Sequence, residues 1–160
     1  MQGLFEFIFE EPSERQLRQE IHKTILFNNL TSKELRLVSQ KVSVRTFTKG
    51  QHVFFEGDAG SALYLILKGS IHIVWHSEGK IIPVTKLSQG MFFGELALVE
   101  DLPRSASAVV LEDATLAFLF RHDVEKLVHY HPKVGNKLLW NLSKVLARRL
   151  RAMNDRARRP

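Results

Sequence analysis

Hydrophobic and polar residues follow a helical spacing at both ends of the chain and form short strand-like runs in the middle. Near the start, Ser13-x-x-Gln16 and Thr31-x-x-Glu34 both have the form of a capping box, in which two side chains satisfy the first free N–H groups of a helix. Apolar residues follow each box at the spacing of one helical face. The pattern predicts N-terminal helices over about residues 13–40.

Between about residues 42 and 120 the apolar residues occur in short runs. Runs such as VSVRTF, HVFFEG and ASAVVL are separated by turn residues, and HSEGK has the composition of a hairpin turn. Short strands divided in this way are typical of an antiparallel sandwich or a small barrel. We therefore predict an antiparallel β-roll, a jelly-roll-like barrel, over about residues 42–120.

The helical spacing returns after Arg121. The run HDVEKLVHY predicts a short helix that stops near Pro132, because proline blocks helix continuation. A long helix follows, with a narrow, nearly heptad-like apolar stripe formed by Val134, Leu138, Leu142, Val145, Leu146, Leu150 and Met153. We expect C-terminal helices over about residues 122–157, and a homodimer formed through this stripe, which a monomer would leave exposed. The whole chain, 1–160, is predicted to be one α+β domain.

The length and the amino-acid composition of the chain are those of a globular protein. The chain has 160 residues, of which 44% are hydrophobic and 25% are charged, as in a compact globular domain. Cysteine is absent, so the sequence offers no disulfide and no thiolate ligand or nucleophile. No apolar run is long enough to span a bilayer, and we expect a cytoplasmic protein without a membrane partner. The apolar, acidic start MQGLFEFIFEEP is either a packed terminal segment or a docking strip for a partner.

The formal net charge of +6 belongs to the C-terminal tail. Residues 144–160 carry seven basic side chains against Asp155 alone, whereas basic and acidic side chains cancel over the rest of the chain. Cations at the end of a helix are favoured by its dipole, so a solvated helix end explains the tail. A salt-sensitive contact with nucleic acid or with an acidic partner is the alternative.

One stretch, GELALVEDLPRSAS at 94–107, places charged residues in strand-like surroundings. Gly94 would let the backbone approach a ligand, and the residues that follow it could form one helical turn. The guanidinium of Arg104 suits a phosphate because its fork donates two parallel hydrogen bonds. The carboxylate of Glu95 only accepts hydrogen bonds and suits a hydroxyl pair such as that of a ribose. The stretch favours a nucleotide site, and an internal Glu95–Arg104 ion pair is the alternative.

These residues also carry a family resemblance. FGELAL at 93–98, followed by PRSAS at 103–107, resembles the phosphate-binding cassette of cyclic nucleotide-binding domains, which occur in protein kinase A regulatory subunits, cyclic nucleotide-gated channels and bacterial catabolite activators. The preceding GDAGSALYLILKGSIHI is similar to the family's first barrel strands, and the resemblance covers roughly residues 22–155.

The resemblance implies a role for each residue of the cassette. Arg104 would bind the cyclic phosphate, and Glu95 would accept a hydrogen bond from the ribose 2′-hydroxyl. The Ser105 hydroxyl and the amides of Ser105 and Ala106 would add donors, while the backbone after residue 93 would line the sugar. The predicted ligand-binding set is Gly94, Glu95, Leu96, Ala97, Arg104, Ser105 and Ala106.

The resemblance also implies that the long helix acts as a lid. VLARRLRAMND is similar to the corresponding helix of the catabolite activator family, and the positions that reach the base would be Met153 and Asn154. The family pattern has small hydroxyl residues there. Asn154 could hydrogen-bond a purine edge, whereas Met153 could only pack against it. Ser105 is compatible with either cAMP or cGMP, and we favour cAMP.

These observations favour a receptor over an enzyme. His122-Asp123, His129 and His131 lack the companion ligands of a metal site, and neither a nucleophile elbow nor a Walker-type loop is present. We expect a regulatory, signalling module with no cofactor besides its nucleotide ligand and with an effector protein that the sequence does not identify. Because the chain ends where a helix-turn-helix would begin, we expect no sequence-specific DNA binding. A dimerising scaffold with a vestigial pocket is the alternative function.

Overall fold

A computed structural model describes residues 12–158, so the apolar acidic start of the chain lies outside the described residues. The chain divides into two compact units. One is formed by the two ends of the chain, up to Ser39 and from Leu127 onwards, and the other is the continuous segment Gln40–Lys126. The predicted α+β class, with helices at both ends and an antiparallel sheet between them, is confirmed.

The unit formed by the chain ends is helical. It contains α2 (Pro12–His22), the 3₁₀ turn η1 (Ile25–Phe27), α3 (Ser32–Ser39) and the long helix α5 (Pro132–Ala157). The capping box before α3 is confirmed, because Thr31 N donates to Glu34 Oε2 at 2.7 Å and Glu34 N donates to Thr31 Oγ1 at 3.3 Å. The helix α4 (Arg121–Tyr130) begins in the sheet unit and ends in this one.

Two contacts attach α5 to the N-terminal segment. Buried Asn141 donates from Nδ2 to the carbonyl oxygens of Leu26 at 3.1 Å and Asn28 at 2.8 Å, which satisfies backbone groups at the end of η1. Lys137 Nζ lies 2.7 Å from Glu34 Oε2. The two ends of the chain are therefore joined by specific polar contacts as well as by apolar packing.

The Glu34–Lys137 pair predicts a pH dependence of stability. Hydrogen bonds from Lys137 and from the Thr31 backbone hold the pKa of the Glu34 carboxyl below its ordinary value. A depressed pKa means that the pair stabilises the fold above the unfolded-state pKa, and that this contribution is lost as the pH falls through the folded-state value. In urea denaturation we expect Lys137→Met to lower the unfolding free energy by at most about 1 kcal/mol at pH 7. The difference from the wild type should shrink as the pH falls below 4.5, the ordinary pKa of a glutamate, towards the folded-state value; a difference that stays constant as the pH is lowered would contradict the assignment.

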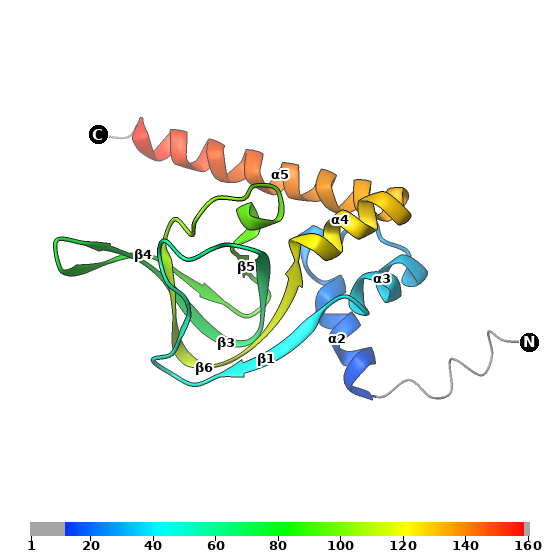
Figure 1. Ribbon diagram of the computed structural model, residues 1–160, viewed down its shortest axis with the longest axis horizontal. Helices are drawn as coiled ribbons and strands as arrows, with labels where there is room; N and C mark the ends of the chain where they lie inside the picture. Colours follow the sequence, from blue (N-terminus) through cyan, green and yellow to red (C-terminus); the bar gives the residue numbers. More distant parts are fainter. Residues whose placement is uncertain (1–11, 159–160) are drawn as a thin grey trace, which may run out of the picture. The chain divides into compact units, whose positions relative to one another are not determined.

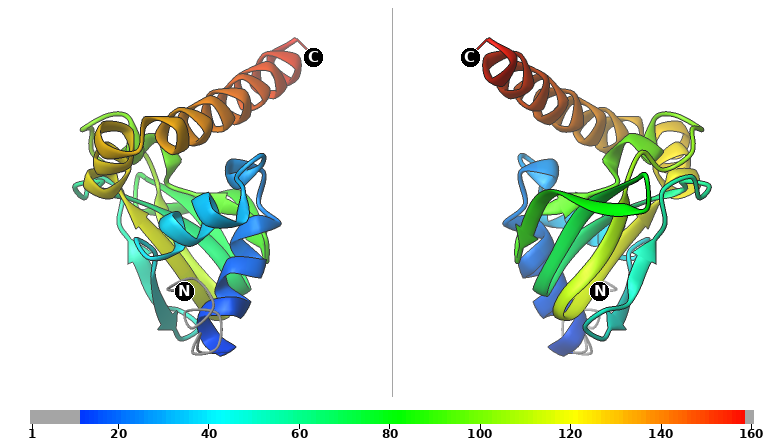
Figure 2. Two further views of the ribbon diagram at one scale, coloured as in Figure 1. Left: turned by 90° about the vertical axis from the view of Figure 1, so that its right-hand side faces the viewer. Right: turned by 90° about the vertical axis from the view of Figure 1, so that its left-hand side faces the viewer.

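The apolar stripe of α5 is largely used within the chain. Val134, Leu138, Leu142 and Val145 are buried, whereas Leu150 is 60% exposed and Met153 is 65% exposed. The expectation that a monomer leaves the whole stripe exposed is therefore wrong for its first half, because those side chains pack inside this chain. The helix itself is uninterrupted, as Figures 1 and 2 show. The homodimer stays a prediction, now resting on the exposed second half of α5.

The continuous unit is an antiparallel six-stranded sheet that curves into a roll (Figure 1). Its strands are β1 (Ser43–Phe47), β2 (His52–Phe54), β3 (Ala62–Ser77), β4 (Lys80–Ser88), β5 (Phe92–Phe93) and β6 (Ser107–Phe120). The order along the sheet is β1-β6-β3-β4, with β2 paired to β6 and β5 paired to β3. The predicted β-roll is confirmed, but the run ASAVVL, from Ser107 onwards, continues without a break to Phe120 as one strand, β6.

Gly69 lets β3 continue where the sequence places a turn residue. Its φ of +85° favours glycine, and the pairing of β3 with β6 shifts register across it, between Lys68 and Ser70. The strand bends there without ending. This irregularity allows one 16-residue strand to take part in a strongly curved sheet.

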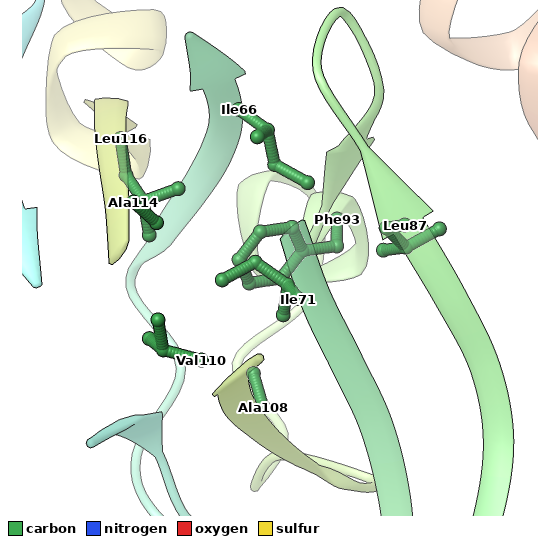
Figure 3. Close-up of a cluster of buried hydrophobic side chains, with 8 residues drawn as sticks. All are labelled: Ile66, Ile71, Leu87, Phe93, Ala108, Val110, Ala114 and Leu116. Carbon is green, nitrogen blue, oxygen red and sulfur yellow. The ribbon is translucent and has the colours of Figure 1, made fainter. Parts of the chain in front are cut away.

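The interior of the roll is filled by a cluster of apolar side chains whose positions Figure 3 shows. They come from β3, β4, β5 and β6 and point toward one another: Ile66, Ile71, Leu87, Phe93, Ala108, Val110, Ala114 and Leu116. Phe93 is the last residue of β5 and directly precedes Gly94. Burial of Phe93 therefore fixes the point from which the stretch 94–107 leaves the sheet. Within residues 12–158, no helix has the length and apolar character that crossing a membrane requires.

Candidate functional site

The backbone of Arg104 is held by the turn that follows β2. Arg104 N donates to the Asp58 carbonyl at 2.8 Å, and Gly57 N donates to the Arg104 carbonyl at 2.8 Å. Next to this pair, Ala59 and Pro103 form an antiparallel bridge. The turn at residues 57–59, which lies far from Arg104 in the sequence, therefore holds the Arg104 backbone independently of the contacts of its side chain.

The guanidinium of Arg104 is buried, with the residue only 9% exposed. Nη2 donates to the Ala62 carbonyl at 2.9 Å and Nη1 donates to the Gly94 carbonyl at 3.3 Å. The carbon Cζ lies 4.2 Å from the ring centre of Phe54 and 5.5 Å from that of Tyr64, which favours the cation through its contact with the aromatic rings. The side chain is therefore held in place on several sides.

One nitrogen of this guanidinium makes no hydrogen bond. Among the residues that the structure describes, the buried Nε of Arg104 has no hydrogen-bond partner. Burial lowers the pKa of the guanidinium from its ordinary value, and the nearby Tyr64, Asp58 and Glu95 act in the opposite direction. A buried N–H without a partner costs free energy, and a buried cation is stabilised by an anion. The site therefore has the donor and the charge to bind an anionic group.

Gly94 makes room for this side chain. It adopts a left-handed conformation, with φ 71° and ψ 19°, just before the 3₁₀ turn η2 (Glu95–Leu98). A Cβ at residue 94 would lie 2.7 Å from Arg104 Nη1 and 3.2 Å from the Ala62 carbonyl oxygen. The left-handed backbone favours glycine, and a side chain at residue 94 would push the Arg104 guanidinium out of its place. The helical turn expected after Gly94 is confirmed as a 3₁₀ turn.

The structure brings some of the other predicted residues to this place and leaves others facing solvent. Glu95 is buried, and its charge acts on Arg104. Ala97 and Ala106 are buried, whereas Leu96 and Ser105 are exposed. The ligand roles of these residues stay predictions. Met153 and Asn154 are exposed on α5, in the other unit, and their contact with a base also stays a prediction.

Sequence reasoning missed three groups that hold the guanidinium. Phe54 lies on β2 and Tyr64 on β3, where an aromatic residue in an apolar run is expected to be part of the hydrophobic core. The Ala62 carbonyl belongs to the backbone, so no residue type in the sequence marks it as a hydrogen-bond acceptor. Gly60 was also missed, although a Cβ there would lie 3.4 Å from Arg104 Nε. In the described part of the chain, no group of three or more metal-ligating side chains is present.

Comparison with known proteins identifies relatives of this chain. It is 38% identical over 127 residues to the "Cyclic AMP receptor protein" of Thermus thermophilus, covering 79% of this chain and 57% of the relative. It is 32% identical to the "cAMP-dependent protein kinase regulatory subunit" of Debaryomyces hansenii, covering 64% of this chain and 22% of the relative. The chain thus spans less than two thirds of the length of either curated relative.

Solved structures agree on the fold. The catabolite activator protein of Thermus thermophilus superposes with a TM-score of 0.75 at 35% identity, covering 84% of this chain and 62% of that one. A cyclic nucleotide-binding domain from Methylobacillus flagellatus gives a TM-score of 0.79 at 28% identity, covering 90% of this chain and 82% of that one.

The sequence model of one family matches residues 44–131, which include every strand after the first residue of β1 and the stretch that carries Arg104. Its description is "Cyclic nucleotide-binding domain", and the match takes in more than half of the 160 residues. The predicted resemblance is therefore confirmed: the chain belongs to the cyclic nucleotide-binding domain family.

Proposed function

We propose that this protein is a receptor for a 3′,5′-cyclic nucleotide, with cAMP bound in preference to cGMP, and that it regulates an effector protein. The observation that carries the proposal is the buried Arg104, whose Nε has no partner among the described residues. The protein does no chemistry on the ligand, because domains of this family are typically non-catalytic regulatory modules.

The chemistry of the residues supports a cyclic phosphate at Arg104. A phosphodiester has one negative charge and two exocyclic oxygens, which match the planar donors of a guanidinium. Nη1 and Nη2 of Arg104 each donate to a carbonyl, and the N–H of Nε has no partner among the described residues and is left for the phosphate. The positive charge is already desolvated, so an anion gains its attraction without a further burial cost for the arginine.

The other cassette residues are proposed to contact the sugar and the phosphate. Glu95 would accept a hydrogen bond from the ribose 2′-hydroxyl, and exposed Ser105 would add a hydroxyl donor. Small side chains at Ala97 and Ala106 leave space for the ligand, and the Gly94–Leu96 backbone lines the sugar.

The preference for cAMP is supported by the two relatives compared above, which are a cyclic AMP receptor protein and a cAMP-dependent protein kinase regulatory subunit. In the response that we propose, ligand binding in the sheet unit changes the position of α5, which then acts on the effector. Base contacts from Met153 and Asn154, and a homodimer through the exposed part of α5, belong to the same proposal.

Isothermal titration of the wild-type chain with cAMP, cGMP and 5′-AMP tests the receptor proposal. We expect saturable binding of cAMP, weaker binding of cGMP, and the weakest binding of 5′-AMP, whose open dianionic phosphate has a different shape and charge. Binding should also raise the melting temperature in a ligand-dependent way. No binding of either cyclic nucleotide at millimolar concentration would contradict the proposal and leave the dimerising scaffold as the function.

A further inference from the structure

A second polar cluster lies close to Arg104 and is not explained by the ligand roles above. Ser107, the first residue of β6, is completely buried. Its Oγ accepts a hydrogen bond from Glu56 N at 2.9 Å and lies 3.3 Å from His76 Nδ1. The carboxylate of Glu56 in turn accepts from His76 N at 3.1 Å through Oε2. The three residues therefore form a closed ring of polar contacts.

The ring joins three segments of the sheet unit. Glu56 lies in the turn after β2, His76 lies near the end of β3, and Ser107 begins β6. A hydroxyl has one proton to donate and can accept two hydrogen bonds, so Ser107 can accept from Glu56 N and donate to an unprotonated Nδ1 of His76 at the same time. In that arrangement the Ser107 hydroxyl, the Glu56 N–H and His76 Nδ1 each have a hydrogen-bond partner within the protein.

The ring is continuous with the contacts that hold the Arg104 backbone. Glu56 directly precedes Gly57 and Asp58, which make the two 2.8 Å hydrogen bonds with the backbone of Arg104. The same turn is closed by Phe55 N, which donates to Asp58 Oδ2 at 2.8 Å. Ser107 is three residues after Arg104. The turn at residues 56–58 therefore contacts the segment 104–107 at both of its ends, through Arg104 and through Ser107.

We propose that Glu56, His76 and Ser107 are positioning residues for Arg104, which fix the turn that holds its backbone and thereby raise the affinity for the anion. The inference rests on the proposed function of Arg104. In this proposal the three residues have no catalytic role, because Ser107 is completely buried and the Glu56 carboxylate binds the backbone of His76 and not its imidazole.

The test compares two buried serines. Ser107→Ala removes both hydroxyl contacts, whereas Ser70→Ala removes a buried hydroxyl on β3 that has no partner among the described residues. We expect Ser107→Ala to weaken cAMP binding in calorimetry about tenfold, the effect of one unmade buried hydrogen bond. Ser70→Ala should bind cAMP within about twofold of the wild type. Equal affinities of the two variants would overturn the positioning role.

Amide hydrogen exchange provides a readout that needs no ligand. In Ser107→Ala the amides of Gly57 and Arg104 should exchange about tenfold faster, while amides in the centre of β3 and β6 keep their rates. If Ser107→Ala accelerates exchange everywhere, the exposed His76 gives the second test: His76→Ala should affect the same two amides, and His76→Asn, which keeps a polar atom near Nδ1, should restore them.

The two proposals fail in different ways. A wild-type chain that binds no cyclic nucleotide contradicts the receptor function. Normal cAMP binding together with unchanged Gly57 and Arg104 exchange in both Ser107→Ala and His76→Ala contradicts the positioning role alone.

Discussion

Arg104→Ala is expected to weaken cAMP binding by roughly 30- to 4,000-fold, equivalent to about 2–5 kcal/mol, because it removes the arginine from the buried charge pair that we propose it forms with the cyclic phosphate. The side chain is fixed by the carbonyls of Ala62 and Gly94 and by the ring of Phe54, so its donors are oriented before the ligand arrives. Titration calorimetry with cAMP measures the effect. Arg104→Lys should fall between the wild type and Arg104→Ala, since it keeps the charge but loses the planar fork.

A matched control separates the site from a general effect of losing an arginine. Arg45 on β1 also lies over an aromatic ring, with Cζ 5.9 Å from the centre of Phe118, but it is exposed. Arg45→Ala should leave cAMP affinity unchanged. If Arg104→Ala folds, as judged by its circular dichroism and its melting curve, and still binds cAMP like the wild type, the phosphate is not bound where we propose.

Gly69→Ala is expected to cause the largest loss of stability among single substitutions of glycine in the sheet unit. Its added Cβ would lie 2.4 Å from the Asp113 carbonyl oxygen and 2.8 Å from the Ala114 Cα, both of which belong to the backbone of β6. The φ of +85° adds strain for any side chain. Since backbone atoms of a paired strand cannot move aside cheaply, the unfolding free energy should fall by roughly 3 kcal/mol or more.

Urea denaturation of Gly69→Ala and Gly90→Ala measures how much of this loss comes from the close contact. Gly90 has nearly the same backbone angle, φ +83°, but an added Cβ would meet nothing within 4 Å. Gly90→Ala should therefore lose only the conformational part, about 1–2 kcal/mol. Equal losses in the two variants would show that the contact with β6 does not matter.

Much of the fold could be predicted from local patterns. The capping box at Thr31 and Glu34, the strand-like runs and the return of helical spacing after Arg121 all depend on neighbouring residues, and the structure confirms each of them. At Gly94 the sequence predicted a close approach of a ligand to the backbone; in the structure the group that lies close to Gly94 is the Arg104 side chain.

What could not be predicted depends on contacts between distant segments. The carbonyl of Ala62 accepts from Arg104 across 42 residues, and a backbone acceptor leaves no mark in the sequence. The partners of Ser107, Glu56 and His76, lie 51 and 31 residues away and look like ordinary surface positions. The stripe of α5 was correctly recognised as apolar, but spacing alone does not say whether such a face packs inside the chain or against another.

Because Asn141 and Lys137 bind residues more than 100 positions earlier, the helical unit is assembled from one segment that is synthesised before the sheet unit and one that is synthesised after it. Residues 12–39 are translated before the sheet unit, whereas the groups that pair with Glu34 and with the end of η1 are translated after it. The sheet unit, continuous in sequence, has all its partners available earlier. The order of translation therefore favours folding of the β-roll before the helical unit can be completed.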